Sequence, residues 1–180
     1  FIVMELVEGE TLDKRISRAP LPVDEALDIC RQVAEGLEVA QEKGIVHRDL
    51  KPSNVMVSAE GKVKILDFGL AKALEPLPTA DLSKTLTQEI DVTKPAVILG
   101  TAPYVSPEQT RGRPLDTRTD IWSFGCVLYE TLAGKRAFPG STTTEVLAKI
   151  LEREPDWSQL PGTVTENVRR LLRRCLEKDP

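Results

Sequence analysis

The sequence predicts a mainly α-helical fold that carries one small β-hairpin. Most segments with regular apolar spacing repeat at three- and four-residue steps, the period of a helix with one buried face. Residues 55–57 and 63–66 have the β-branched composition of strands, and Glu60-Gly61 between them favours a hairpin turn. The chain has 180 residues, of which 41% are hydrophobic and 29% charged. It is therefore long enough and apolar enough for a packed core, and its composition is not that of a disordered chain.

Two helices are predicted before the hairpin. An apolar run at residues 1–4 indicates a buried strand, which Gly9 interrupts before a short helix that begins at Thr11. A longer helix opens at Pro22 and ends before Gly44, a residue that favours the backbone conformation just after a helix. Its apolar residues fall on one face: Ala26, Ile29, Cys30, Val33, Leu37 and Ala40.

The second half of the chain begins with a long irregular stretch. Between residues 70 and 99 the apolar spacing fades, and several prolines and hydroxyl residues predict a loop. Pro107 stands at the first position of a short predicted helix. Residues 119–130 are apolar on nearly all sides, which predicts a helix buried in the centre of the domain. Two further amphipathic helices are predicted at 144–152 and 166–177.

Charge and cysteine usage exclude several classes of function. The net charge of −4 argues against a nucleic-acid partner and against contact with an anionic membrane. No apolar run approaches the length of a membrane-spanning helix. Cys30, Cys126 and Cys175 each fall in a predicted helix and are far apart in the sequence, so buried free thiols are favoured over disulfides or metal ligands.

Two segments carry the chemistry: HRDLKPSN at residues 47–54 and DFG at 67–69. Transfer of a phosphoryl group to a hydroxyl requires a carboxylate that orients the hydroxyl and accepts its proton. It also requires a cation that balances the moving phosphate, and oxygen ligands for Mg²⁺. The segments supply these groups in turn, through Asp49, Lys51, and the pair Asn54 and Asp67. The predicted hairpin between them brings Asn54 and Asp67 near each other.

With GTAPYVSPE at residues 100–108, these segments resemble the catalytic core of the protein kinase family. Lys51, two places after Asp49, is typical of the Ser/Thr type. The sequence at residues 97–101 and 106–109 is similar to that of bacterial kinases of the eukaryote-like type. The resemblance implies a Ser/Thr protein kinase that transfers the γ-phosphate of ATP to hydroxyls of protein substrates. It implies ATP and Mg²⁺, for which Mn²⁺ can substitute.

The resemblance covers the whole chain as a partial kinase domain, residues 1–180. Residues 1–9 resemble the last strand of the N-lobe and the hinge, and residues 10–180 resemble the C-lobe without its final helix. Neither a Gly-rich phosphate loop nor a Val-Ala-Ile-Lys strand precedes residue 47. The expected fold is therefore a kinase-like C-lobe, helical with a small hairpin, and we expect this piece alone to be inactive.

By the same resemblance, Asp49 is the catalytic base and Lys51 bridges to the γ-phosphate, while Asn54 and Asp67 hold Mg²⁺. The competing interpretations are a turn-capping carboxylate for Asp49 and a solvated surface lysine for Lys51. The resemblance places His47 against the Phe of Asp-Phe-Gly, as part of the core and not as an acid–base group.

The nucleotide site is implied at three further positions. Backbone groups of Glu5 and Val7 are expected to hydrogen-bond to adenine, and Met56 is expected to lie beneath the adenine ring. The phosphate end of the nucleotide is expected to contact Lys51, Asn54 and Asp67. A flexible apolar side chain suits a flat ligand, although an ordinary core methionine remains the competing interpretation for Met56.

Regulation is expected in the activation segment, residues 67–108. Arg48 is the implied partner of a phosphate carried by this segment, and Thr85 or Thr87 is the favoured acceptor. A plain structural salt bridge is the alternative for Arg48. Thr101 is implied to hydrogen-bond Asp49 and Lys51, which positions the substrate.

Two other functions compete with a protein kinase: a pseudokinase or scaffold module, and a small-molecule phosphotransferase of kinase-like fold. The intact Asp49, Asn54 and Asp67 disfavour the first, and the Ser-Pro-Glu segment at 106–108 disfavours the second. A kinase domain of this type is expected in the cytoplasm, with no membrane contact of its own. The substrate, flanking domains, any membrane anchor elsewhere and the oligomeric state are left open by the sequence.

Overall fold

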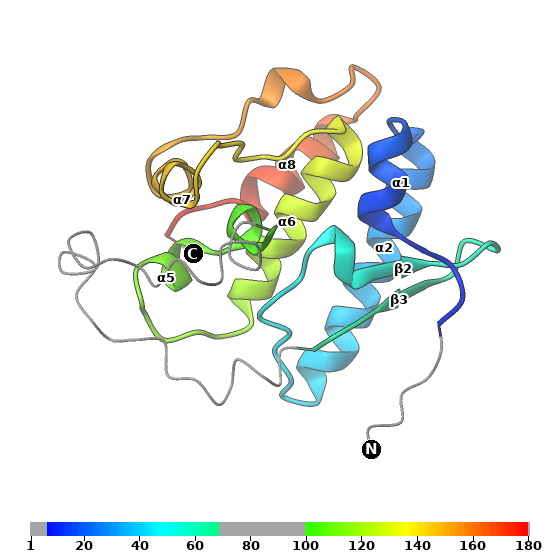
Figure 1. Cartoon of the computed structure of the whole chain (residues 1–180), viewed down its shortest axis with the longest axis horizontal. Helices are drawn as coiled ribbons and strands as arrows, with labels where there is room; N and C mark the ends of the chain where they lie inside the picture. Colours follow the sequence, from blue (N-terminus) through cyan, green and yellow to red (C-terminus); the bar gives the residue numbers. More distant parts are fainter. Residues whose placement is uncertain (1–6, 69–99, 180) are drawn as a thin grey trace.

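Helix α6 (Arg118–Ala133) runs through the middle of the molecule, with α2 (Val23–Glu42) on one side and α8 (Glu166–Cys175) on the other (Figure 1). The computed structural model describes residues 7–68 and 100–179. Most α6 side chains are buried, which confirms the central helix predicted from its apolar composition. Gly134 ends the helix with a left-handed φ of 66°.

Helix α2 buries the face that its apolar spacing predicts. Its buried residues are Ala26, Ile29, Cys30, Val33, Leu37 and Ala40. Gly44 follows the helix with a φ of 71°, so the predicted stop is confirmed. A Cβ at Gly36 would lie 2.9 Å from Cδ1 of Ile65, which shows how closely α2 approaches the sheet.

The sheet has three short antiparallel strands in the order β1-β2-β3. The predicted hairpin is present as β2 (Val55–Val57) and β3 (Val63–Ile65), with Val55 opposite Ile65. The prediction of a hairpin alone was incomplete, because β1 (Glu10–Thr11) adds a third strand beside β2. Two residues are too few to show the alternation that marks a strand in a sequence.

The remaining elements surround this centre. Helix α1 (Leu12–Arg18) follows β1 directly, α5 (Pro107–Thr110) begins with the predicted proline, and α7 (Thr143–Glu152) starts one residue before its predicted bound. Helix α8 ends at Cys175 and not at residue 177. Three 3₁₀ turns complete the described chain: η1 (Pro52–Asn54), η2 (Ala102–Tyr104) and η3 (Trp157–Gln159).

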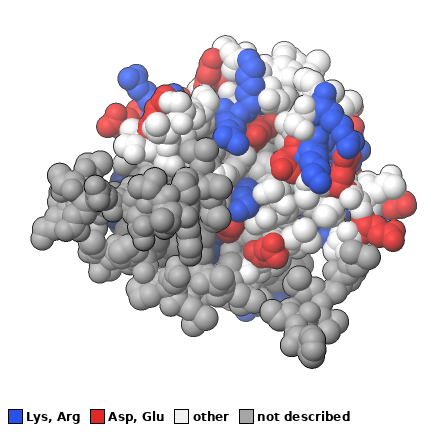
Figure 2. Space-filling view, in the orientation of Figure 1, with Lys and Arg blue, Asp and Glu red and all other residues white. Residues whose placement is uncertain are grey.

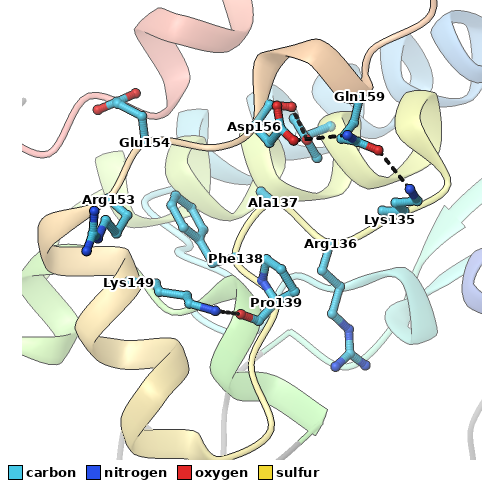
Figure 3. A pocket seen from close by; sticks show the side chains of 11 residues that line it. Lys135, Arg136, Ala137, Phe138, Pro139, Lys149, Arg153, Glu154, Asp156 and Gln159 are labelled. Carbon is cyan, nitrogen blue, oxygen red and sulfur yellow. Dashed lines mark hydrogen bonds between the residues drawn. The ribbon is translucent and has the colours of Figure 1, made fainter.

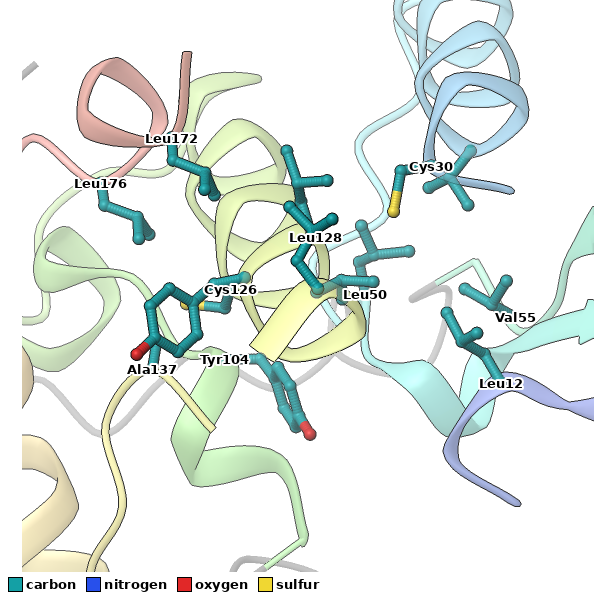
Figure 4. Packing of buried hydrophobic residues seen from close by; sticks show 14 of the residues in the cluster. Leu12, Cys30, Leu50, Val55, Tyr104, Cys126, Leu128, Ala137, Leu172 and Leu176 are labelled. Carbon is teal, nitrogen blue, oxygen red and sulfur yellow. The ribbon is translucent and has the colours of Figure 1, made fainter. Parts of the chain in front are cut away.

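The core lies on both sides of α6. Figure 4 shows Cys126 and Leu128 of α6 between Leu172 and Leu176 on one side and Leu50 on the other, and all five are at most 1% exposed. Burial of a leucine side chain contributes about 2 kcal/mol to folding. This core connects the helices to the segment that follows α2, where the candidate site lies.

The three cysteines are free and buried, as predicted. Burial raises the pKa of Cys30 to about 12, so this thiol is protonated at neutral pH and behaves as a small apolar side chain. None of the helices in the described ranges combines the length and apolar character that a bilayer span requires.

Candidate active site

The segment HRDLKPSN forms a loop between α2 and β2, and the buried Asp120 of α6 holds its start. The Asp120 carboxylate accepts hydrogen bonds from the backbone N–H groups of His47, at 2.7 Å, and Arg48, at 2.8 Å. Burial raises the pKa of Asp120 above its usual range, and the two backbone hydrogen bonds oppose that rise. A side chain of the central helix therefore sets the position of the loop backbone.

His47 is fully buried, and the contacts of its ring define which nitrogen carries the proton. The backbone N–H of Asp49 donates to Nδ1 at 3.2 Å, so Nδ1 acts as an acceptor. Nε2 lies 2.9 Å from the carbonyl oxygen of Leu66, to which it can only donate. The ring also contacts Phe68, with centroids 4.7 Å apart. Both nitrogens thus have structural partners, in agreement with the predicted core role of this histidine.

Arg48 and Asp67 have left-handed backbone conformations, with φ values of 64° and 53°. Few residues other than glycine adopt such angles, and outliers of this kind cluster at functional sites. Arg48 stands at the start of the loop and Asp67 directly follows the strand β3 and Leu66. The two unusual conformations therefore bracket the candidate site.

Lys51 lies between Asp49 and Thr101. Its Nζ is 2.9 Å from Oδ2 of Asp49 and 3.1 Å from Oγ1 of Thr101, and the two charged side chains are only about one-fifth exposed. The Asn54 side chain donates from Nδ2 to the carbonyl oxygen of Asp49 at 3.0 Å. Four of the residues selected from the sequence are thus connected by direct hydrogen bonds.

Asn54 and Asp67 come together through the hairpin. The backbone N–H of Leu66 donates to the Asn54 carbonyl at 2.8 Å, so Asp67 is one residue from a direct partner of Asn54. Because Nδ2 of Asn54 donates to Asp49, the amide oxygen is the atom of this side chain that could bind a metal ion. An amide oxygen and a carboxylate are hard donors that suit Mg²⁺, which takes its remaining ligands from water and phosphate. Within residues 7–68 and 100–179, no group of three or more His, Cys, Asp or Glu could hold a metal.

Of the residues predicted to bind adenine or to accept a regulatory phosphate, the structure describes only Val7 and Met56. Met56 is half-buried on β2 between the buried Val55 and Val57, so it faces away from the core. Val7 is half-buried at the start of the described chain. Glu5 lies outside the described residues, as do both favoured phosphate acceptors, Thr85 and Thr87.

A cavity of about 520 Å³ borders the loop at Pro52 and Ser53. Tyr104 and Glu130 line it, and the tyrosine hydroxyl donates to the Glu130 carboxylate at 2.6 Å. Burial raises the pKa of Glu130, and the hydrogen bond from Tyr104 opposes that rise. The sequence carried no signal for this pair, because its members belong to η2 and α6 and meet only in the fold.

Helix α5 also contacts the loop. Gln109 donates from its side chain to the carbonyl of Arg48 at 3.3 Å, and Glu108 accepts the hydroxyl of Thr119 at 2.7 Å. Ser106 and Gln109 form a reciprocal capping box at the start of α5. The Ser-Pro-Glu-Gln spacing could have indicated the cap, but the contact with Arg48 follows from tertiary structure.

Comparison with known proteins adds an independent observation. The family model described as "Protein kinase domain" matches residues 1–180. A serine/threonine-protein kinase PknA of Corynebacterium glutamicum is 40% identical over 181 residues, which cover 100% of this chain and 35% of that protein. PknA of Mycobacterium tuberculosis is 38% identical over 181 residues, with 38% of its length covered.

The serine/threonine-protein kinase PknB of Mycobacterium leprae is 36% identical over 182 residues, with all of this chain and 27% of that protein covered. The chain thus spans about a third of the length of the curated relatives that it matches. The match of the family model along the whole chain confirms the resemblance found in the motifs. The chain belongs to the protein kinase family, and it is similar to bacterial kinases of the Ser/Thr type.

Proposed function

We propose that this chain is the catalytic part of a bacterial Ser/Thr protein kinase, which transfers the γ-phosphate of ATP to serine and threonine hydroxyls of protein substrates. The observation that carries the proposal is the position of Lys51, whose Nζ joins the Asp49 carboxylate and the Thr101 hydroxyl. A carboxylate beside a cation supplies two of the groups that a phosphoryl transfer to a substrate hydroxyl requires, and Thr101 helps to hold the cation in place.

In the proposed mechanism, Asp49 orients the substrate hydroxyl and accepts its proton as the phosphoryl group leaves. A carboxylate of ordinary basicity is sufficient, because the hydroxyl proton leaves late in a loose transition state. Lys51 would balance the charge of the moving γ-phosphate, and the Thr101 hydroxyl, which accepts a hydrogen bond from Lys51, would hold the ammonium in position. Asp120 fixes the loop that carries these groups, so the arrangement exists before substrate binds.

Asn54 and Asp67 are the proposed Mg²⁺ ligands. Bound Mg²⁺ would neutralise charge on the nucleotide phosphates and hold them in line with the acceptor. The hydrogen bond from Asn54 Nδ2 to the Asp49 carbonyl orients the amide so that its oxygen is available. The backbone groups of Glu5 and Val7 would bond to adenine, and Met56 would lie beneath its ring. In this proposal residues 1–9 are the last N-lobe strand and hinge, and residues 10–180 are the C-lobe.

Regulation is proposed through residues 67–108. A phosphate on Thr85 or Thr87 would pair with Arg48, whose guanidinium suits bidentate contact with a phosphate. The left-handed conformation of Arg48 supports a specialised role at this position. The proposed location of the kinase domain is the cytoplasm, where ATP is available.

Calorimetry with Mg²⁺–ATP on the complete protein tests the assignment of roles. Asp49→Asn and Asp67→Asn should both abolish phosphoryl transfer, but only Asp67→Asn should weaken Mg²⁺–ATP binding, by about tenfold or more, because it removes a metal ligand. Asp116→Asn, at an exposed carboxylate on the surface, is the matched control and should change neither property. Equal losses of affinity in the first two variants would show that the roles are wrong.

A second measurement addresses the 180-residue chain alone. We propose that it does not turn over ATP at a useful rate, because the Gly-rich loop and lysine strand typical of kinases are not in this sequence. Autophosphorylation by the purified chain at about 1 s⁻¹, the low end for kinases, would contradict this proposal.

A further inference from the structure

A second and larger cavity, of about 760 Å³, adjoins the one that borders the catalytic loop. Arg136 lines both cavities, so the two hollows meet at this side chain. The larger cavity lies between the end of α6, the loop at residues 135–139, α7 and the segment at 153–159 (Figure 3). A peptide that occupied both cavities would pass Arg136.

The floor of the larger cavity offers no free polar group. Tyr129, Ala137 and Phe138 form it, and each is at most 6% exposed. The Tyr129 hydroxyl donates to the carbonyl oxygen of Asp156 at 2.7 Å, so its only polar atom is already engaged. The rim, and not the floor, must determine which ligands the cavity accepts.

Two of the rim cations are held by the protein. Lys149 donates to the Glu145 carboxylate at 2.8 Å and to the Pro139 carbonyl at 2.6 Å, so its charge is compensated. Lys135 donates to the side-chain oxygen of Gln159 at 2.7 Å. Gln159 is neutral, but the nearby Asp156 carboxylate, whose pKa is lowered by hydrogen bonds and by the charge of Lys135, partly compensates that charge.

The other two rim cations form no direct ion pair among the described residues, but the charge of Arg136 acts on the nearby Glu130 carboxylate and opposes the rise that burial causes in its pKa. Figure 3 shows Arg153 and Arg136 on opposite sides of Phe138 and Pro139, where they flank the cavity. Both are exposed, and neither guanidinium forms an ion pair within the part of the chain that the structure describes. A planar guanidinium with free donors suits bidentate recognition of a carboxylate.

Among the described residues, neither rim anion forms an ion pair with Arg136 or Arg153. The Asp156 carboxylate accepts hydrogen bonds from Ser158 and Gln159, and the Glu154 side chain points away from the cavity in Figure 3. Four basic and two acidic residues thus line a hollow in a chain whose net charge is −4. Elsewhere on the described part of one face, cationic and anionic side chains lie intermixed (Figure 2). An extended polyanion such as a nucleic acid meets no continuous basic surface there.

We infer that this cavity binds an acidic segment of the protein substrate, at some distance from the phosphorylated residue, with Arg136 and Arg153 as its main contacts. The inference rests on the proposed kinase function and adds a substrate class to it. Charge complementarity at a concave surface gives selectivity among peptides that share the same acceptor residue.

Peptide kinetics on the complete protein test this inference. A serine peptide is prepared in a series in which a Glu-Glu pair moves stepwise along the sequence, with matching Gln-Gln peptides. One position of the pair should lower KM about tenfold without changing kcat, because binding is remote from the reacting atoms. Arg136→Ala and Arg153→Ala should each remove that advantage, and Arg136→Glu should transfer it to a Lys-Lys pair.

The matched control is Arg170→Ala, at an exposed arginine of α8 that donates only to Asn167 among the described residues and lies outside the cavity lining. It should leave the preference unchanged. The inference is overturned if no position of the Glu-Glu pair gives an advantage, or if the advantage survives both Arg136→Ala and Arg153→Ala.

Fluorescence anisotropy separates this inference from the proposed function. A labelled Glu-Glu peptide should bind the complete protein that carries Asp49→Asn, and Arg136→Ala should weaken binding about tenfold. If binding behaves in this way while the wild-type protein phosphorylates no peptide, the kinase proposal fails and the acidic-segment site stands. If Gln-Gln peptides are phosphorylated with the same KM and kcat as Glu-Glu peptides, the kinase proposal stands and the acidic-segment site is refuted.

Discussion

The buried carboxylate of Asp120 accepts the backbone N–H of His47 at 2.7 Å, across 73 positions of the sequence. With the neighbouring bond from Arg48, this contact attaches the proposed catalytic loop to the central helix. Asp120→Ala should lower the free energy of unfolding by about 3 kcal/mol, because one buried and one partly buried N–H group lose a charged acceptor. Asp120→Asn should cost less, since its amide oxygen can still accept one of the two bonds. Urea unfolding followed by circular dichroism measures both.

The control for this prediction is Asp116→Ala. Asp116 is exposed and pairs with Arg118, so its loss should cost no more than about 1 kcal/mol. Similar losses for Asp116→Ala and Asp120→Ala would contradict the anchoring role of Asp120.

The hydroxyl of Thr101 should contribute to catalysis through Lys51. Thr101→Val removes the acceptor 3.1 Å from Lys51 Nζ and should lower kcat of the complete protein about tenfold, the equivalent of one hydrogen bond. Nucleotide affinity should not change. Thr101→Ser keeps the hydroxyl and should retain most of the activity. Steady-state kinetics of the two variants test whether the Thr101 hydroxyl contributes to catalysis. A fully active Thr101→Val variant would remove Thr101 from the proposed mechanism.

The contact between α6 and α8 should depend on the absence of a side chain at Gly125. A Cβ there would lie 2.7 Å from Cβ of Cys175, an atom that cannot move without its backbone. Gly125→Ala should therefore destabilise the fold by about 2 kcal/mol, although alanine is the better helix former. Gly36→Ala in α2 is the matched variant, because its Cβ meets only the flexible end of Ile65. Thermal unfolding should show a clear difference between the two, and equal midpoints would refute the explanation.

The start of α7 should respond to acid through Glu145. Hydrogen bonds from Lys149 and Ser141 lower the pKa of this carboxyl from 4.5 to about 2. A lowered carboxyl pKa means that its stabilisation is fully present above pH 4.5 and is lost as the pH falls from 4.5 to about 2. The difference in unfolding midpoint between the wild type and Glu145→Gln should shrink over that interval. A difference that stays constant from pH 5 to pH 2 would contradict the assignment.

Periodicity predicted the long helices well, because α2 and α6 each need many apolar residues on the faces that they bury. It could not predict β1, whose two residues are defined only by their pairing with β2. The pairing of β2 with β3 was predictable, since composition and turn residues act locally there.

The candidate site also has a part that the sequence predicts and a part that only the fold creates. The motifs identified Asp49, Lys51, Asn54 and Asp67 because the chemistry requires those residue types close together in the sequence. The contact of Gln109 with Arg48 spans 61 positions, and the pair Tyr104 and Glu130 joins two separate elements. Such contacts depend on how helices pack, which no local pattern in a single sequence encodes.

The left-handed conformations of Arg48 and Asp67 have a consequence for how the chain tolerates change. A left-handed conformation costs a non-glycine residue roughly 1–2 kcal/mol, whereas glycine adopts it without penalty. A mutational library selected only for folded protein should therefore accept glycine at both positions. The same library selected for phosphorylation should reject it. Positions where the two selections disagree would mark this site without any knowledge of its ligand.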